Sequence, residues 1–157
     1  MIAYLSGAME NAKNEGSAWR NEMTIWLKEK LNHSVIDPII ETQKLVKKHN
    51  QSNYREFKES EPKHFINFVR HCIDNDLDSV INKTDYTICL WNDDVIPGGG
   101  THGEVTMAYY YNKPLYLINQ LNVPNNISGW IMSCASEIFT DFESMQRRLL
   151  EIYGEKI

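Results

Sequence analysis

Residues 85–118, DYTICLWNDDVIPGGGTHGEVTMAYYYNKPLYLI, decide how this chain folds. Their pattern predicts a buried strand over 86–91, a loop with three successive glycines, a helix from about Thr101 and a second buried strand over 114–118. Two apolar runs joined by about ten helical residues predict a βαβ unit, and a βαβ unit implies a parallel sheet.

Parallel sheets bind ligands beyond the carboxyl ends of their strands, where loops lead into helices. In this βαβ unit that junction carries polar side chains and glycines. They are Trp91, Asn92, Asp93, Asp94, Gly98, Gly99, Gly100 and Glu104. We therefore expect an active site, if the chain has one, at this junction.

The rest of the chain repeats the alternation of strands and helices. Short strands are predicted over 2–5, 34–38 and 137–139. Helices are predicted after Gly7, over 63–82, 127–135 and 142–153, and residues 41–60 form either an exposed helix or a mobile insertion. This order predicts a single domain over 1–157 with a doubly wound, flavodoxin-like α/β fold, in which about five parallel strands carry helices on both faces.

Composition narrows the function classes. The net charge of −5 and the absence of a basic stripe argue against a partner of duplex nucleic acid. No apolar run approaches the ~20 residues that span a bilayer, and no signal peptide is apparent, so we expect a cytoplasmic protein without a membrane partner. The three cysteines are widely spaced in apolar surroundings, and we expect buried free thiols.

Glu104 has two interpretations. Thr101 and Glu104 match a capping box, in which the glutamate bonds back to the amide at the helix start. Alternatively, a carboxylate in the first helical turn is stabilised in its ionised form by the positive helix end, as a nucleophile requires. The glycine-rich loop beside it would let a substrate approach closely.

Asp76 stands out on the helix predicted over 63–82. At 100° per residue it falls within the apolar stripe, whereas Asp74 and Asp78 point to the opposite side. A carboxylate is rarely buried without a partner or a purpose. Asp76 and Glu104 would suit the two carboxylate roles of glycoside cleavage, although Asp76 would equally suit a structural pairing with Arg20 or Arg70.

Other motifs are incomplete. The glycine run lacks the lysine of a phosphate-binding loop, His102 and Glu104 lack the cysteine pair of zinc deaminases, and the histidines show no metal-ligand spacing. We therefore expect no metal and no cofactor. Tyr4, Trp91 and Trp130 are candidates for stacking on a nucleobase, with a core role equally open.

Several short segments along most of the chain form a further pattern. They are residues 4–9 (YLSGAM), 75–80 (NDLDSV), 83–85 (KTD), 100–104 (GTHGE) with Ala108 and 113–114 (KP), and 128–133 (SGWIMS). In this order they resemble segments of the nucleoside 2-deoxyribosyltransferase-like superfamily. Ala8 departs from the proline that is usual there, and residues 97–99 lack an aspartate that many transferases carry. These departures bear on transferase activity and base preference more than on the glycosidic chemistry.

The resemblance implies metal-free cleavage of the N-glycosidic bond of a (deoxy)nucleoside or nucleotide. Glu104 would be the nucleophile that forms a glycosyl-enzyme, and Asp76 would assist proton transfer to the departing base. Transfer to a free nucleobase would serve nucleoside salvage; a nucleoside monophosphate N-glycosidase and a silent nucleotide-binding module are the alternatives. The substrate-binding candidates are Tyr4, Ser6, Gly7, Met9, Arg20, Trp91, Asn92, Asp94 and Gly100, with Arg20 either holding a phosphate or lying on the surface.

The same resemblance implies a homo-oligomer, because sites in this family are often completed by a neighbouring chain. Tyr109, Tyr110 and Tyr111 offer an apolar surface for such an association. We therefore expect a dimer or a higher assembly.

Overall fold

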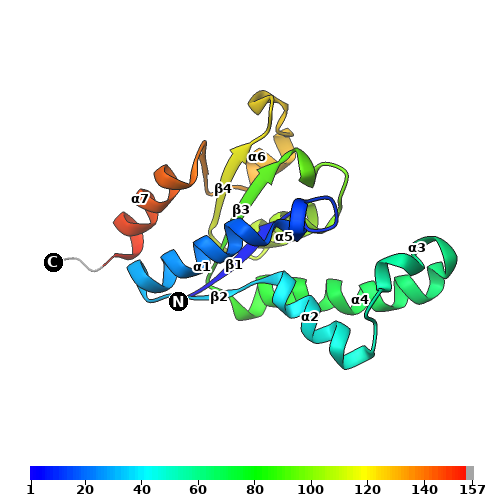
Figure 1. Cartoon of the computed structure of the whole chain (residues 1–157). Coiled ribbons are helices and arrows are strands. Elements are labelled where there is room, and N and C mark those ends of the chain that lie inside the picture. Colours follow the sequence, from blue (N-terminus) through cyan, green and yellow to red (C-terminus); the bar gives the residue numbers. More distant parts are fainter. Residues whose placement is uncertain (155–157) are drawn as a thin grey trace.

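A computed structural model describes residues 1–154 as one parallel sheet flanked by helices (Figure 1). The strands are β1 (Ile2–Gly7), β2 (Ser34–Ile36), β3 (Tyr86–Asn92), β4 (Leu115–Gln120) and β5 (Glu137–Phe139). Their order across the sheet is β2-β1-β3-β4-β5, and every neighbouring pair is parallel. This is the flavodoxin-like order, so the predicted fold class is confirmed.

The helices follow the strands in alternation. They are α1 (Ser17–Leu31), α2 (Pro38–His49), α3 (Phe57–Ser60), α4 (Pro62–Asp78), α5 (Gly100–Tyr110), α6 (Gly129–Cys134) and α7 (Phe142–Tyr153). Shorter turns are η1 (Lys13–Gly16), η2 (Tyr54–Glu56), η3 (Ser79–Lys83), η4 (Asp93–Val95) and η5 (Pro124–Asn126). The strand over 137–139 and the helix over 142–153 have the predicted bounds.

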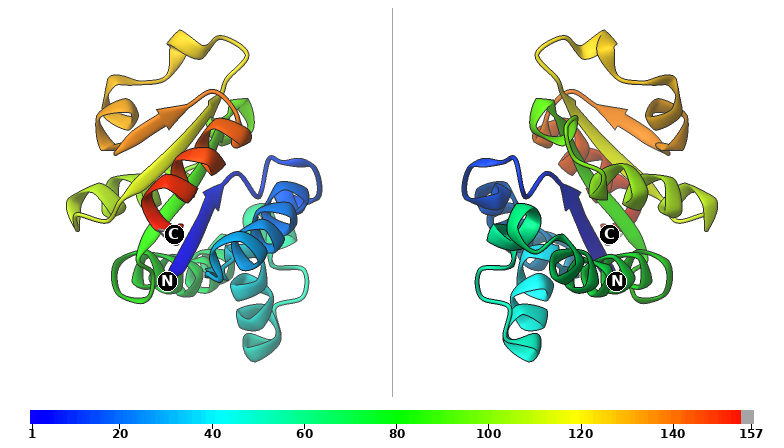
Figure 2. Two further views of the ribbon diagram at one scale, coloured as in Figure 1. Left: turned by 90° about the vertical axis from the view of Figure 1, so that its left-hand side faces the viewer. Right: turned by 90° about the vertical axis from the view of Figure 1, so that its right-hand side faces the viewer.

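Helices lie on both faces of the sheet (Figure 2), and an apolar layer on each face holds them there. On one face α1 and α7 contribute Met23, Leu27, Met145 and Leu149, which pack on alternate residues of β1, β3 and β4. On the other face α5 and α6 cover Cys89, Trp91, Leu115 and Leu117. The alternation along β3 follows from the two-residue period of a strand, and both faces are buried because helices cover both.

Helices α2 and α4 extend beyond the sheet as an arm, with α3 near its tip (Figure 1). The sequence left residues 41–60 undecided, and the structure resolves them into most of α2, a turn and α3. Asp37 begins α2 by accepting a hydrogen bond from the Ile39 amide at 2.9 Å, and Pro38 occupies the first turn. β2 therefore ends at Ile36, two residues before the predicted bound, and Pro38 starts the arm.

Helix α4 ends earlier than predicted. The α-helical geometry stops at Asp78, and residues 79–83 form a wider π-helical turn. The Thr84 hydroxyl donates to the carbonyls of Ser79 and Val80, which helps to satisfy the end of this turn. The predicted bounds of 63–82 merged the two because the apolar periodicity continues to Val80.

All three cysteines are free and buried, as predicted. Within residues 1–154, no helix combines the length and the apolarity that crossing a bilayer would require.

Candidate active site

The strand order reverses at β1, because β2 lies on one side of it and β3 on the other. Such a switch point opens a crevice at the carboxyl ends of the two central strands. A cavity of about 440 Å³ lies there. Its wall comes from the loop after β1, the loop between β3 and α5, one face of α4, and residues of η2 and α3. The cavity is therefore where the sequence places the ligand site.

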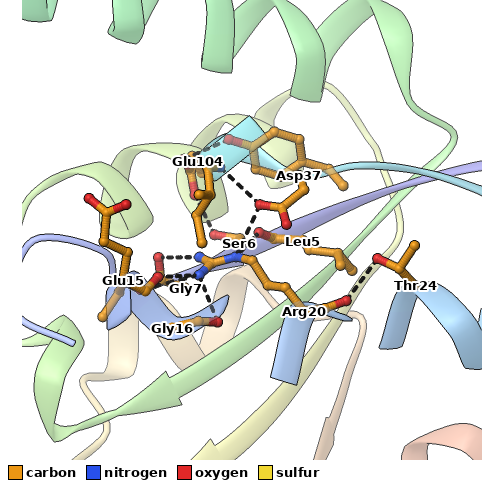
Figure 3. Close-up of polar contacts among 12 residues, drawn as sticks. Leu5, Ser6, Gly7, Glu15, Gly16, Arg20, Thr24, Asp37 and Glu104 are labelled. Carbon is orange, nitrogen blue, oxygen red and sulfur yellow. Dashed lines mark hydrogen bonds and ion pairs between the residues drawn. The ribbon is translucent and has the colours of Figure 1, made fainter. Parts of the chain in front are cut away.

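Glu104 lies at the inner end of this cavity and is 6% exposed. The Tyr4 hydroxyl donates to Oε1 at 2.8 Å, and the Ser6 hydroxyl donates to Oε2 at 2.5 Å. Tyr4 and Ser6 point to the same face of β1 because they are two residues apart on one strand. Both carboxylate oxygens are thus held by the adjacent strand (Figure 3).

The capping-box interpretation of Glu104 is wrong. Helix α5 has Gly99 as its N-cap, and no side chain bonds to that cap. The helix begins at Gly100 and its N-cap lies two residues before Thr101, so Thr101 is the second helical residue and Glu104 the fifth. A capping glutamate must be the third. Glu104 also lies beyond the first turn, where the effect of the helix dipole fades, so its charge depends on Tyr4 and Ser6 instead.

Asp76 reaches the same cavity from α4 and is half-buried, whereas Asp74 is exposed. Burial, followed by the negative charge of Glu104, raises the pKa of Asp76 to about 8. A hydrogen bond with Asn75 opposes this rise. Asp76 is consequently protonated at neutral pH.

Burial also raises the pKa of Glu104, but two hydroxyl donors and the nearby positive charge of Arg20 oppose the rise. Hydrogen bonds donated to a carboxylate favour its ionised form. Glu104 therefore has more support for its charge than Asp76, whose pKa the negative charge of Glu104 helps to raise. The site places two carboxyl groups with different surroundings in one cavity.

Arg20 is neither on the surface nor in the cavity wall, which corrects the surface interpretation. It is 0% exposed and donates to five carbonyl oxygens, two at the end of β1 and three in the segment that follows, at 2.8–3.3 Å (Figure 3). Asp37 lies 3.8 Å from its Nε. Arg20 thus builds the loop around the site, and this geometry leaves it no contact with a phosphate in the cavity.

The remaining candidates divide into two groups. Gly7, Met9, Asp94 and Gly100 line the cavity. Trp91 and Asn92 do not, because Trp91 packs into the core under α5, at 1% exposed, and Asn92 turns to the opposite face of β3. Tyr4 is likewise fully buried, so it orients Glu104 rather than stacking on a base.

Close packing around Gly7 explains why this position is a glycine. A Cβ at this position would meet the Trp19 ring at 3.0 Å and the Leu90 carbonyl at 3.4 Å. The strand end must therefore lack a side chain for α1 to pack closely. Packing of α1 therefore accounts for this glycine, which also lines the cavity.

The sequence missed the outer wall of the cavity. Tyr54, Arg55 and Lys58 reach it from η2 and α3. Tyr54 packs on Phe68 of α4 with ring centroids 4.8 Å apart, and Phe57 packs edge-on against His64 at 5.0 Å. Aromatic residues inside a polar segment were the available signal that it folds back on α4.

Among residues 1–154, no group of three or more histidine, cysteine, aspartate or glutamate side chains is arranged to hold a metal ion. The expectation of metal-free chemistry stays a prediction.

Comparisons with known proteins identify the fold. No family model matches the chain, and no curated protein matches its sequence. A solved structure of a 2-deoxyribosyltransferase from the psychrotolerant bacterium Bacillus psychrosaccharolyticus matches with a TM-score of 0.60. The two chains share one fold. The match has 21% sequence identity and covers 93% of this chain and 90% of the other, so it bears out the resemblance at the level of the fold.

Proposed function

We propose that this protein cleaves the N-glycosidic bond of a (deoxy)nucleoside and transfers the 2'-deoxyribosyl group to another nucleobase. The observation that carries this proposal is the state of Glu104: a buried carboxylate, facing a cavity, with each oxygen held by a hydroxyl of β1. A purely structural glutamate has no need of a second carboxylate in the same cavity, and Asp76 supplies one.

In the first step a Glu104 oxygen attacks the anomeric carbon. The new bond joins that oxygen to the sugar, and the bond between the anomeric carbon and the base nitrogen breaks. The bonding electrons leave with the base. The base receives the Asp76 proton either on the nitrogen that leaves the sugar or on another ring nitrogen, which gives a tautomer of the free base. The raised pKa of Asp76 supports this role, because a general acid must hold its proton at working pH.

In the second step the nitrogen of an acceptor base attacks the anomeric carbon of the glycosyl ester. The ester bond breaks, Glu104 regains its charge, and the ionised Asp76 takes the proton that the acceptor loses. Tyr4 and Ser6 serve both steps, because their hydroxyls stabilise the returning charge. Water in place of the base would give hydrolysis.

The cavity wall is suited to a base and a sugar. Phe65, Val69, Ile73 and Leu77 recur every four residues along α4 and present an apolar strip to the cavity. Apolar walls with a few polar groups at one end are typical of small-molecule sites. The flat faces of a base would pack on this strip, and the sugar would lie at Glu104.

The test is to incubate the protein with each deoxynucleoside, with and without a second free base, and to separate the products by chromatography. A new nucleoside that forms only with the acceptor establishes transfer; free base released equally without it establishes hydrolysis. Glu104→Gln should lower turnover at least about 1,000-fold with binding retained, whereas Glu22→Gln on the exposed face of α1 should not. Full turnover in Glu104→Gln, or binding without turnover in the wild type, would contradict the proposal and favour a sensing module.

We also propose that copies of the chain associate. Tyr109, Tyr110 and Tyr111 are 58%, 73% and 47% exposed at the end of α5, and an aromatic cluster of this kind is enriched at protein interfaces. Light scattering after size exclusion should give a mass of at least two chains. A monomeric mass at micromolar concentration would remove this proposal.

A further inference from the structure

Arg55 and Lys58 are the cations in the described wall of the cavity. Arg55 belongs to η2 and Lys58 to α3, the segment that folds back over α4. Both are partly exposed, so they lie where the cavity meets solvent. The proposed nucleoside chemistry gives neither of them a task.

Each cation is paired with a carboxylate from the loop after β1. Arg55 donates to Glu15, and Lys58 Nζ lies 2.8 Å from Glu10 Oε1. The side chains are 35–57% exposed, and ion pairs that are this exposed hold weakly and exchange readily. A stronger anion entering the cavity would therefore displace the carboxylates.

The loop that presents Glu15 is conformationally strained. Asn14 and Glu15 have φ of 49° and 56°, in the left-handed region that residues other than glycine seldom adopt. Arg20 holds this geometry by donating to the Glu15 and Gly16 carbonyls at 2.8 and 3.2 Å. Strain that the surroundings maintain is concentrated at ligand sites, and here it directs a carboxylate at Arg55.

Arg55 also reaches inward. It lines the same cavity as Cys72 and Asp76 of α4. Cys72 is four residues before Asp76, which is about 6 Å along a helix. A group attached to the 5'-oxygen of a sugar at Glu104 is only a few bonds from the anomeric carbon, so it would lie in the cavity that Arg55 and Lys58 also line.

We propose that the cavity takes a nucleoside that carries a 5'-phosphate, with Arg55 and Lys58 releasing Glu15 and Glu10 to bind the phosphate. The planar fork of an arginine matches two phosphate oxygens, and Lys58 adds a point charge. The inference rests on the proposed function for the position of the sugar and base. It assigns the phosphate to the arm and not to Arg20.

The test measures binding, so that it does not depend on turnover. Titration calorimetry on the full chain carrying Glu104→Gln compares a deoxynucleoside, its 5'-monophosphate and its 3'-monophosphate. We expect the 5'-monophosphate to bind roughly tenfold or more tightly than either of the others. Equal affinity for the three ligands, or for the two phosphate isomers, would overturn the proposal.

Charge variants then identify the residues. Adding Arg55→Gln with Lys58→Gln should weaken binding of the 5'-monophosphate roughly tenfold and leave binding of the deoxynucleoside unchanged. The matched control, Lys44→Gln with Arg147→Gln, removes two cations from exposed pairs outside the cavity and should change neither. If binding of both ligands weakened equally, the ion pairs of Arg55 and Lys58 would only hold the arm to the loop after β1, which would contradict the proposal.

Removing the two carboxylates tests the proposal in the opposite direction, because it should strengthen binding and not weaken it. Glu10→Gln with Glu15→Gln frees both cations and should strengthen binding of the 5'-monophosphate, whereas a fastening role predicts weaker binding of both ligands. The two proposals fail separately. Selective binding of the 5'-monophosphate by a protein that turns over no substrate would leave the phosphate site intact and remove the glycosidic chemistry.

Discussion

Two buried polar clusters lie at opposite ends of the same sheet. At the carboxyl end, Tyr4 and Ser6 hold Glu104. At the amino end, His33 Nδ1 lies 2.9 Å from the Tyr86 hydroxyl, and the Tyr116 and Tyr153 hydroxyls lie 2.9 Å apart. Both clusters bury hydroxyl groups of β1, β3 or β4, and both have their polar atoms paired.

The clusters differ in charge. The cluster at the amino end is made of phenols and an imidazole, and burial raises the pKa of Tyr86 and Tyr116 and lowers that of His33, so these three side chains stay neutral at neutral pH. The cluster at the carboxyl end buries a carboxylate and faces a second one across a cavity. Neutral polar networks complete a core, whereas a buried charge beside open volume is costly and indicates chemistry.

The largest effect is expected at Asp76. Asp76→Asn removes the proton donor and should lower turnover about 100- to 10,000-fold. The same change should stabilise the fold by about 1–2 kcal/mol above pH 8, because the amide never has to ionise in a buried position. Kinetics and urea unfolding measure the two effects, with exposed Asp74→Asn as the control. Loss of both activity and stability would mean that Asp76 only supports the helix.

The pH dependence of turnover follows from the same residue. The pKa of Asp76 is raised to about 8, so the acid is protonated below that pH and turnover should decline as the pH rises through it. The wild-type rate should fall about tenfold for each pH unit above the midpoint, whereas the residual rate of Asp76→Asn should not follow this curve. A wild-type rate that stays constant to pH 10 would exclude Asp76 as the acid.

A matched pair of hydroxyl deletions compares the two clusters directly. Tyr4→Phe removes a donor to Glu104, so we expect the pKa of Glu104 to rise and turnover at pH 6 to fall roughly tenfold. Tyr86→Phe removes the partner of His33 and should cost about 1–2 kcal/mol of unfolding free energy with turnover unchanged. If Tyr86→Phe impaired turnover as much as Tyr4→Phe, the two ends of the sheet would not be functionally separate.

The smallest effect concerns acid stability. Burial, followed by the charge of the N-terminal amine, lowers the pKa of His33 in the folded protein. The unfolded chain therefore binds the proton more readily, so this contribution is fully present above about pH 6.5 and is lost as the pH falls. Between pH 7.5 and 5 we expect a loss of about 0.5–1 kcal/mol that His33→Gln abolishes. An identical pH slope in the variant would assign the effect to other groups.

The sequence predicted the sheet and most helices because apolar periodicity reports which face of an element is buried. It predicted a site at the end of β3 and singled out Asp76 for the same reason. A charged residue on an apolar helix stripe can be recognised from residue spacing alone. It failed where the answer depended on helix phase. The capping box at Thr101 and Glu104 is a correct local pattern that the preceding glycines displace by two residues.

The positions of Arg20 and of residues 41–60 stayed open for a different reason. Arg20 could be placed on the surface or at a phosphate because its partners are backbone carbonyls of residues 5–16, and a sequence does not show where carbonyls lie. Residues 41–60 could be an exposed helix or a mobile insertion because the ion pairs that fix this part of the arm join residues 40 and 48 positions apart. Contacts of that kind follow only from the folded chain.

The glycines ahead of Glu104 also set the size of what the cavity admits. Gly99, Gly100 and Gly103 line the cavity, and a Cβ at any of them would meet no atom within 4 Å. None of the three has the positive φ that would demand glycine. Their missing methyl groups are therefore unfilled space and not a folding requirement. Alanine introduced at one, two and then three of these positions would narrow the cavity in steps, and the largest ligand that still binds would gauge the dimensions of the natural one.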